Sequence, residues 1–210
     1  MTARTWLGID AAVKIGTIAL LALAIFAPDL PQFQGKAFVG RAIAYPIALA
    51  VAPIAWWFLG RGRVPFPVAT DILLGLPFVI DMGGNALNLY DTIDWWDDAN
   101  HLGNWALHTS AIVLLVRGFA PAVIVAIGLA WAATTAILWE LSEYVAFVPN
   151  SPEAATAYQD TLGDLALGLL GGTLASVALA WTFARTRSRQ AASAAMASPI
   201  EASAPASGHP

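Results

Sequence analysis

Six apolar stretches of about 20 residues or more follow one another along the chain, and they constrain its fold more than any other feature. The hydrocarbon core of a bilayer is about 30 Å thick, which an α-helix crosses in roughly 20 residues. The stretches are too long for β-strands and show no sustained alternation of apolar and polar residues. We therefore predict an all-α, polytopic membrane helix bundle with about six transmembrane helices, at Trp6–Ala27, Phe38–Leu59, Pro67–Tyr90, Trp95–Val116, Pro121–Val148 and Tyr158–Phe183.

The composition agrees with a membrane protein and excludes several other classes. Only 11% of the residues are charged and 58% are hydrophobic, whereas soluble domains carry about 25% charged residues. The formal net charge is -4 and there is no basic patch, so we expect no nucleic-acid partner. Without cysteine, the chain cannot form disulfides, thiolate metal sites or a cysteine nucleophile. Walker, Rossmann, Gly-x-Ser-x-Gly and His-Glu-x-x-His motifs are also absent from the sequence.

The basic residues predict the orientation of the bundle. Eight Lys and Arg residues fall on one side of the predicted spans, and only Lys36 and Arg41 fall on the other. By the positive-inside rule, we expect both termini to be cytoplasmic. Residues 1–184 then form one six-helix transmembrane domain. Residues 185–210 are rich in Ala, Ser and Pro, which predicts a disordered cytoplasmic tail.

Most of the acidic residues fall on the opposite, outer side of this topology. Eleven of the 14 lie in outer loops or in the outward halves of predicted spans. Asp97, His101 and His108 share one face of the fourth span, and the pairs Glu140/Glu143 and Asp160/Asp164 each share a face of a later span. Because lipid cannot satisfy polar groups, we expect these side chains to face the bundle interior and to meet near its outer end.

The number of acids in this region raises an electrostatic problem. Two carboxylates about 6 Å apart repel by about 2.8 kcal/mol at an effective dielectric constant of about 20, so they cannot all be ionised and unpaired. A bound cation, protonation of several acids, or separation into water would each solve the problem. A metal site, a proton or cation pathway and a structural network therefore all remain open. The seven acids are Asp81, Asp97, Asp98, Glu140, Glu143, Asp160 and Asp164.

Three segments resemble, in the same order, the YjdF-like family of bacterial inner-membrane proteins. They are Leu89–Asp91 with Trp95–His101, then Trp139–Tyr144, then Tyr158–Leu165, within a match that covers about residues 81–172. A weaker resemblance to VanZ-like membrane proteins rests on an Asp-x-x-x-His helix and on an Asp near a Gly-rich final helix. The resemblance implies a multi-pass protein of the bacterial cell (inner) membrane and supports the acidic and His site residues, but it implies no particular reaction.

We predict a site with a divalent metal ion as its cofactor. Its metal ligands are Asp97, His101, Asp160 and Asp164, and Glu140 and Glu143 are its catalytic residues. An enzyme of this kind would be a metal-dependent hydrolase or would modify a lipid or envelope intermediate. The alternatives are a proton- or cation-coupled transporter and a non-catalytic membrane scaffold, and in each case the lipid bilayer surrounds the protein. Second candidates for the site are Asp98, His108, Tyr158 and Asn88.

Overall fold

The computed structural model describes residues 2–146, 148–150 and 152–202. Within these ranges the regular structure is entirely helical and no residue lies in a β-strand, which confirms the predicted all-α class. The long helices are α1 (Ala3–Phe26), α2 (Phe38–Ala55), α3 (Val68–Ala86), α5 (Trp96–Leu115), α6 (Pro121–Ala146) and α7 (Ala157–Ala202). The short ones are η1 (Pro31–Phe33), the π-helical η2 (Trp56–Gly60), α4 (Leu89–Thr92), η3 (Val148–Asn150) and η4 (Pro152–Ala155).

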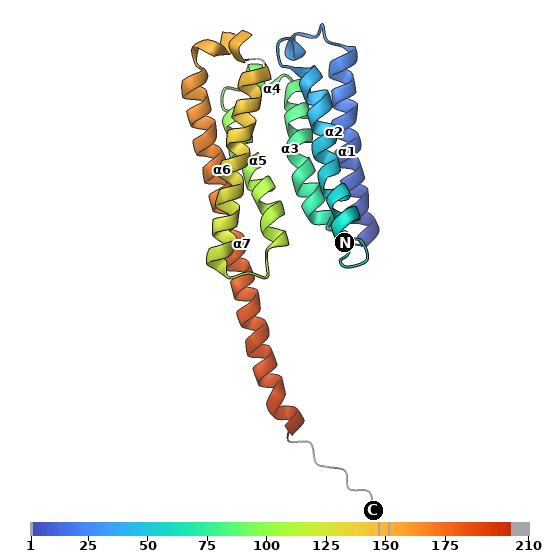
Figure 1. Cartoon of the computed structure of the whole chain (residues 1–210), viewed down its shortest axis with the longest axis vertical. Helices are drawn as coiled ribbons and strands as arrows, with labels where there is room; N and C mark the ends of the chain where they lie inside the picture. Colours follow the sequence, from blue (N-terminus) through green and yellow to red (C-terminus); the bar gives the residue numbers. More distant parts are fainter. Residues whose placement is uncertain (1, 147, 151, 203–210) are drawn as a thin grey trace, which may run out of the picture.

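The long helices form two packed groups (Figure 1). One contains α1, α2 and α3, and the other contains α5, α6 and α7. The two groups meet where α3 packs against α5. Residues from both groups therefore face the space between them, and this is where the polar side chains of α3 and α5 are found.

Among the residues that the structure describes, four helical segments are long and apolar enough to cross a membrane by length and composition. They are Ala3–Phe26, Phe38–Gly60, Pro121–Ala146 and Ala157–Met196. The third and fourth predicted spans correspond to α3 and α5, which are not among the four because their acids and amides lower the mean hydropathy. Many of those polar side chains are buried inside the bundle, whereas large apolar side chains such as Ile43 and Ile47 are 63% exposed on the outside of α2.

Two glycines of α7 allow it to lie unusually close to its neighbours. A Cβ atom added at Gly171 would collide with the backbone carbonyl of Leu102 in α5, and one at Gly172 would collide with Ala132 in α6. Small residues permit this close approach of helix backbones. The contact fixes α7 against α5, so it also sets where the acidic start of α7 lies relative to α5.

A buried charged group connects α1 and α3 at the end of the bundle near the N-terminus. The ammonium group of Lys14 donates a hydrogen bond to Asp10 at 2.9 Å and a second one to Asp71. Both carboxylates are buried. This group lies at the end of the bundle that is predicted to be cytoplasmic. It joins α1 and α3 by charge-assisted hydrogen bonds.

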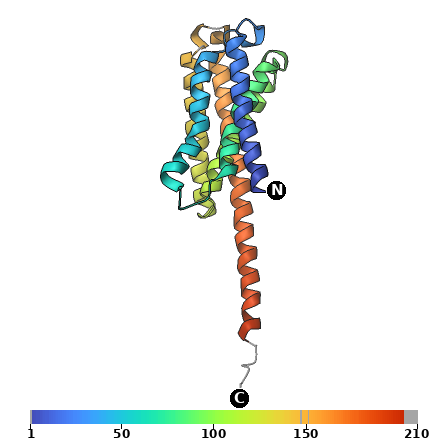
Figure 2. The ribbon, with the colours of Figure 1, turned by 90° about the vertical axis from the view of Figure 1, so that its right-hand side faces the viewer.

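The chain beyond Arg185 differs from the sequence prediction. We expected a disordered tail from this residue, but α7 continues without a break to Ala202 (Figure 2). Ala, Arg and Gln favour the helix, so this segment continues the helix although residues 189–196 are exposed and pack against no core. Residues 203–210, the rest of the predicted tail, lie outside the described residues.

Candidate functional site

A cavity of about 520 Å³ lies between the two helix groups, and polar side chains form much of its wall. α5 supplies one side of the wall and α3 another, because the polar faces of both helices line the space between the two helix groups. α2 and α6 contribute Arg41 and Glu143. This volume lies in the range of ligand sites in proteins, roughly 300–1,000 Å³.

One face of α5 carries the residues that define the cavity. Asp97, His101, Trp105 and His108 follow one another at helical spacing and all line it. The His101 ring stacks on the Trp105 indole with 5.4 Å between ring centroids and 7° between planes. The stacking holds the imidazole in one orientation, and His101 is only 5% exposed.

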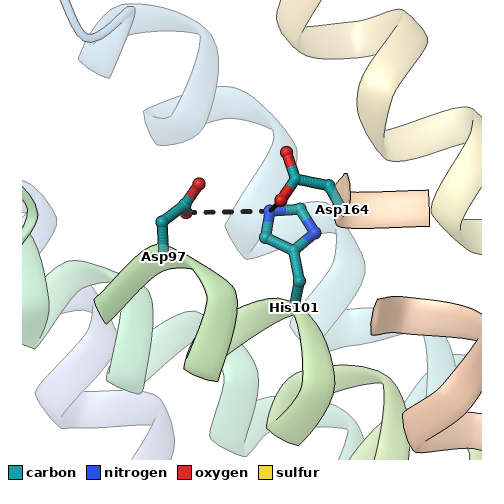
Figure 3. Close-up of side chains that lie close together, drawn as sticks. All are labelled: Asp97, His101 and Asp164. Atoms are coloured by element: carbon teal, nitrogen blue, oxygen red, sulfur yellow. Dashed lines mark ion pairs between the residues drawn. The ribbon is translucent and has the colours of Figure 1, made fainter. Parts of the chain in front are cut away.

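His101 lies between carboxylates from two helices (Figure 3). Its Nε2 atom lies 3.7 Å from Oδ1 of Asp97 in α5 and 3.7 Å from Oδ1 of Asp164 in α7. On the other side of the ring, Nδ1 lies 3.8 Å from Oε1 of Glu140 in α6. The three helices that pack together in one half of the bundle therefore each direct a polar group at the same imidazole.

These separations are too long for hydrogen bonds, which join N and O atoms at about 2.7–3.2 Å. They are close to the spacing between two ligands of one metal ion: atoms bound at about 2.1 Å in a tetrahedral site lie about 3.4 Å apart. Asp97, His101 and Asp164 offer one ligand atom each within 4.8 Å of one another. His101, Glu140 and Glu143 form a second group that meets the same limit.

Glu140 has a buried carboxylate oxygen beside the His101 ring. The residue is 9% exposed, and its Oε1 atom has no hydrogen-bond partner among the described residues. This is the atom that faces Nδ1 of His101. A buried carboxylate oxygen without a partner is costly, and closure of the ring N–H onto it would both satisfy the oxygen and direct Nε2 toward a metal ion.

Asp81 is the acid of the predicted cluster that the protein neutralises with its own groups. Nη1 of Arg41 donates to both Asp81 oxygens, at 2.8 and 2.6 Å. The hydroxyls of Tyr45 and Tyr90 donate to the same carboxylate at 2.6 and 3.0 Å, and the Asn85 amide donates at 3.2 Å. With its oxygens already satisfied, Asp81 is not available to the cluster around His101.

Sequence reasoning missed the part that Arg41, Tyr45 and Tyr90 play. Arg41 was assigned only to the outer side of the topology, yet its guanidinium reaches Asp81 and comes within 3.8 Å of Glu143. A lone Arg early in an apolar span was the available signal, since such a residue needs a buried acid as its partner. The two tyrosines carried no comparable signal.

The remaining candidates are more dispersed. Asp160 lines the cavity but is exposed and belongs to neither three-residue group. His108 lies at the cavity wall, where Nε2 contacts the Leu74 carbonyl at 3.2 Å.

Asp98 is exposed and Tyr158 is 74% exposed, and neither lines the cavity. Asn88 has a left-handed backbone conformation at the start of α4 and also lies outside the cavity wall.

Comparison with known proteins gives a family for the chain. No curated protein and no solved structure matched it, and nothing found supports the VanZ-like resemblance. Residues 10–185 match the family described as Predicted membrane protein (DUF2238), and that range includes every residue that lines the cavity. The match covers most of the chain, from the first helix into the last. The chain therefore belongs to the DUF2238 family of predicted membrane proteins.

Proposed function

We propose that the chain is a multi-pass protein of the bacterial cell (inner) membrane, with six spans and both termini in the cytoplasm. Four helical segments are long and apolar enough to span, and α3 and α5 have the length to complete the set while burying many of their polar groups inside. The basic residues favour this orientation. The cavity then opens toward the extracytoplasmic side. The YjdF-like resemblance of residues 81–172 falls inside the matched family range and supports the same location.

The function that the site supports best is that of a membrane-embedded, metal-dependent hydrolase acting on a lipid or envelope intermediate. The observation that carries this proposal is the position of one buried imidazole between two carboxylates at Nε2 and a third at Nδ1. Mixed imidazole and carboxylate ligands suit zinc, manganese or iron. The buried, unpartnered oxygen of Glu140 supports the same interpretation. It can accept a hydrogen bond from Nδ1–H of His101 when Nε2 of the same ring binds a metal ion.

Each side chain then has a defined role. Asp97, His101 and Asp164 bind the ion, and Glu140 orients the imidazole. Asp160 contributes negative charge to the cavity wall one helical turn before Asp164. Glu143 lines the cavity and lies between His101 and Arg41, so we assign it as the general base. A metal ion of this type lowers the pKa of a bound water molecule and supplies hydroxide for hydrolysis.

The metal content of the purified protein tests this proposal. Wild-type protein in detergent should contain about one equivalent of a divalent ion, measured by elemental analysis. The metal content of His101→Gln should fall below a tenth of that value, because the variant lacks the Nε2 ligand atom that lies between the Asp97 and Asp164 carboxylates. Asp98→Asn is the matched control, since it removes an exposed acid on the same helix outside the cavity. A wild-type protein without metal, or a His101→Gln variant with full metal, would refute the proposal.

A proton- or cation-coupled transporter is the second candidate, and one observation favours it. The buried Lys14–Asp10–Asp71 group places ionisable side chains at the other end of the bundle, as a pathway with access from both sides requires. Flux in proteoliposomes across a panel of cations and pH gradients tests it. Flux that is lost in Asp71→Asn would favour the transporter. The absence of flux for every ion tested would rule the transporter out.

A further inference from the structure

A second, apolar groove lies beside the polar cavity, between α2 and α6. Its volume is about 270 Å³. It begins at Ala37, just before α2, and then follows Gly40, Ala44 and Ala48, which are spaced so that they lie on one helical face. Small side chains on this face leave room between the helices, and a Cβ added at Gly40 would meet nothing within 4 Å.

The groove and the polar cavity are adjacent and share part of their walls. Both are lined by Arg41, Phe78, Trp139, Ser142 and Glu143. A molecule that fills both must therefore have an apolar part and a polar part, which is the composition of a lipid. In a membrane, the medium that surrounds α2 and α6 is itself lipid, so the groove gives such a molecule a lateral path to the site.

The length and direction of the groove fit one hydrocarbon chain. From Phe38, where α2 begins, to Ala48 the helix rises about 15 Å at 1.5 Å per residue, which is close to half of the roughly 30 Å hydrocarbon core. The groove starts at the N-terminal end of α2, and Lys36, which lines the polar cavity, directly precedes it. A chain in the groove therefore spans one leaflet and places its headgroup at the polar cavity.

Two residues of the cavity wall carry buried N–H donors that lack a partner in the part of the chain that the structure describes. The indole Nε1 atoms of Trp105 and Trp131 have no hydrogen-bond partner among the described residues, and both residues line the cavity. Trp105 is only 6% exposed. Arg41 and Lys36 also line the cavity at the groove side, where they pair with Asp81 and Asp91. Mg²⁺ held by one or two carboxylates commonly binds substrate phosphate oxygens as well. A divalent ion at the His101 cluster would attract a phosphate group by the same charge, so a phosphate group fits this site.

We infer that the groove between α2 and α6 binds one acyl chain of a phospholipid whose phosphate occupies the polar cavity. This inference rests on the proposed function, because it names the substrate class of the same site. It makes α2 and α6 the lateral entrance for the lipid.

Photocrosslinking in nanodiscs tests the inference. The probe is a phosphatidylcholine that carries a diazirine on one acyl chain, diluted in unlabelled phosphatidylcholine. We expect adducts at Ala44 and Trp139 in the groove to exceed those at the lipid-facing Ile43 and Ile47 by at least fivefold. Equal labelling of the two sets would overturn the inference.

Filling the groove provides the matched comparison. Ala44→Trp should reduce the Trp139 adduct at least fivefold, whereas Ile43→Trp, one residue away on the outward face, should leave it unchanged. Ala48→Phe is a second groove variant for the case that Ala44→Trp does not fold. A diazirine diacylglycerol, which lacks phosphate, should label Trp139 at less than a fifth of the phospholipid level. Equal labelling by the two lipids, or full labelling in both groove variants, would overturn the inference.

The metal content of the same nanodisc samples separates the two proposals. Full metal with even labelling would refute the groove and leave the metal site in place. Groove labelling without metal would refute the metal-dependent function and leave the acyl-chain site in place.

Discussion

The Nε2 atom of His101 in α5 lies 3.7 Å from Oδ1 of Asp164 in α7, although the two residues are 63 positions apart in the sequence. Both side chains are buried. The pair is too far apart for a hydrogen bond and at nearly the right distance for two ligands of one ion. This relationship depends on how closely α7 lies against α5, and on the groups that orient the imidazole.

The Glu140→Gln variant should bind metal more weakly without losing the site. Groups that orient a metal-bound imidazole typically contribute 10–100-fold to metal affinity. We therefore expect the dissociation constant to rise by about that factor, while the stoichiometry at saturating metal stays the same. Titration in competition with a chelator measures both values. An unchanged affinity would show that Glu140 does not orient His101.

Arg41→Gln should destabilise the bundle strongly, because it leaves the Asp81 carboxylate buried without its cation. Breaking a buried ion pair from one side costs about 3–5 kcal/mol, and the side chains of Arg41 and Asp81 are only 13% and 7% exposed. The free energy of unfolding in mixed micelles measures the loss. The double variant Arg41→Gln, Asp81→Asn should recover part of it.

The control for Arg41 is Lys36→Gln. Lys36 also donates to both oxygens of an acid, at 2.9 Å each, but its partner Asp91 is 46% exposed. Exposed ion pairs contribute about 0–1 kcal/mol. If Lys36→Gln proves as damaging as Arg41→Gln, the difference in burial does not explain the role of Arg41.

Gly171→Ala should move α7 away from α5 and so weaken the metal site from a distance. The added methyl group would collide with the carbonyl of Leu102, and overpacking of this kind costs about 1–3 kcal/mol. We expect a lower melting temperature together with weaker metal binding. Gly103→Ala is the matched control, because a Cβ there meets nothing within 4 Å. In this exposed helical position alanine should be neutral or stabilising by up to about 1 kcal/mol.

Ending the chain after Arg189 should change neither stability nor metal binding. Residues 190–196 of α7 are exposed and extend beyond the bundle (Figure 2). Changes at exposed positions stay within about 0.5 kcal/mol, which corresponds to a shift of about 2 °C or less in melting temperature. A larger shift, measured by thermal unfolding in detergent, would mean that this part of α7 contacts the bundle.

The long helices could be predicted from the sequence because their apolar stretches have the length of a membrane span. Their ends were less predictable. The third span was expected to reach Tyr90, but α3 ends at Ala86, and Asn88 takes a left-handed conformation before the short α4. The continuation of α7 beyond Arg185 was also not predicted from the sequence. The composition of this segment shows that it cannot form a core, but its alanines still favour a helix.

The grouping of acids around His101 agrees with the sequence prediction, in which an expected even number of spans and the rule against polar groups in lipid place them at one end. The individual pairings could not be predicted. Helical spacing placed Asp97 and His101 on one face, but it could not show that Asp164 and Glu140 face opposite nitrogens of the ring. Nor could it show that Arg41 neutralises Asp81. Both depend on the rotation of each helix about its axis, which close contacts such as Gly171 against Leu102 determine.

Anomalous X-ray diffraction from crystals grown with a divalent metal ion tests the metal site most directly. If Asp97, His101 and Asp164 bind the ion, the strongest anomalous peak lies about 2.1 Å from Nε2 of His101, and it disappears in Asp164→Asn crystals under the same conditions. A peak elsewhere, or none near His101 when metal is present in excess, would contradict the account.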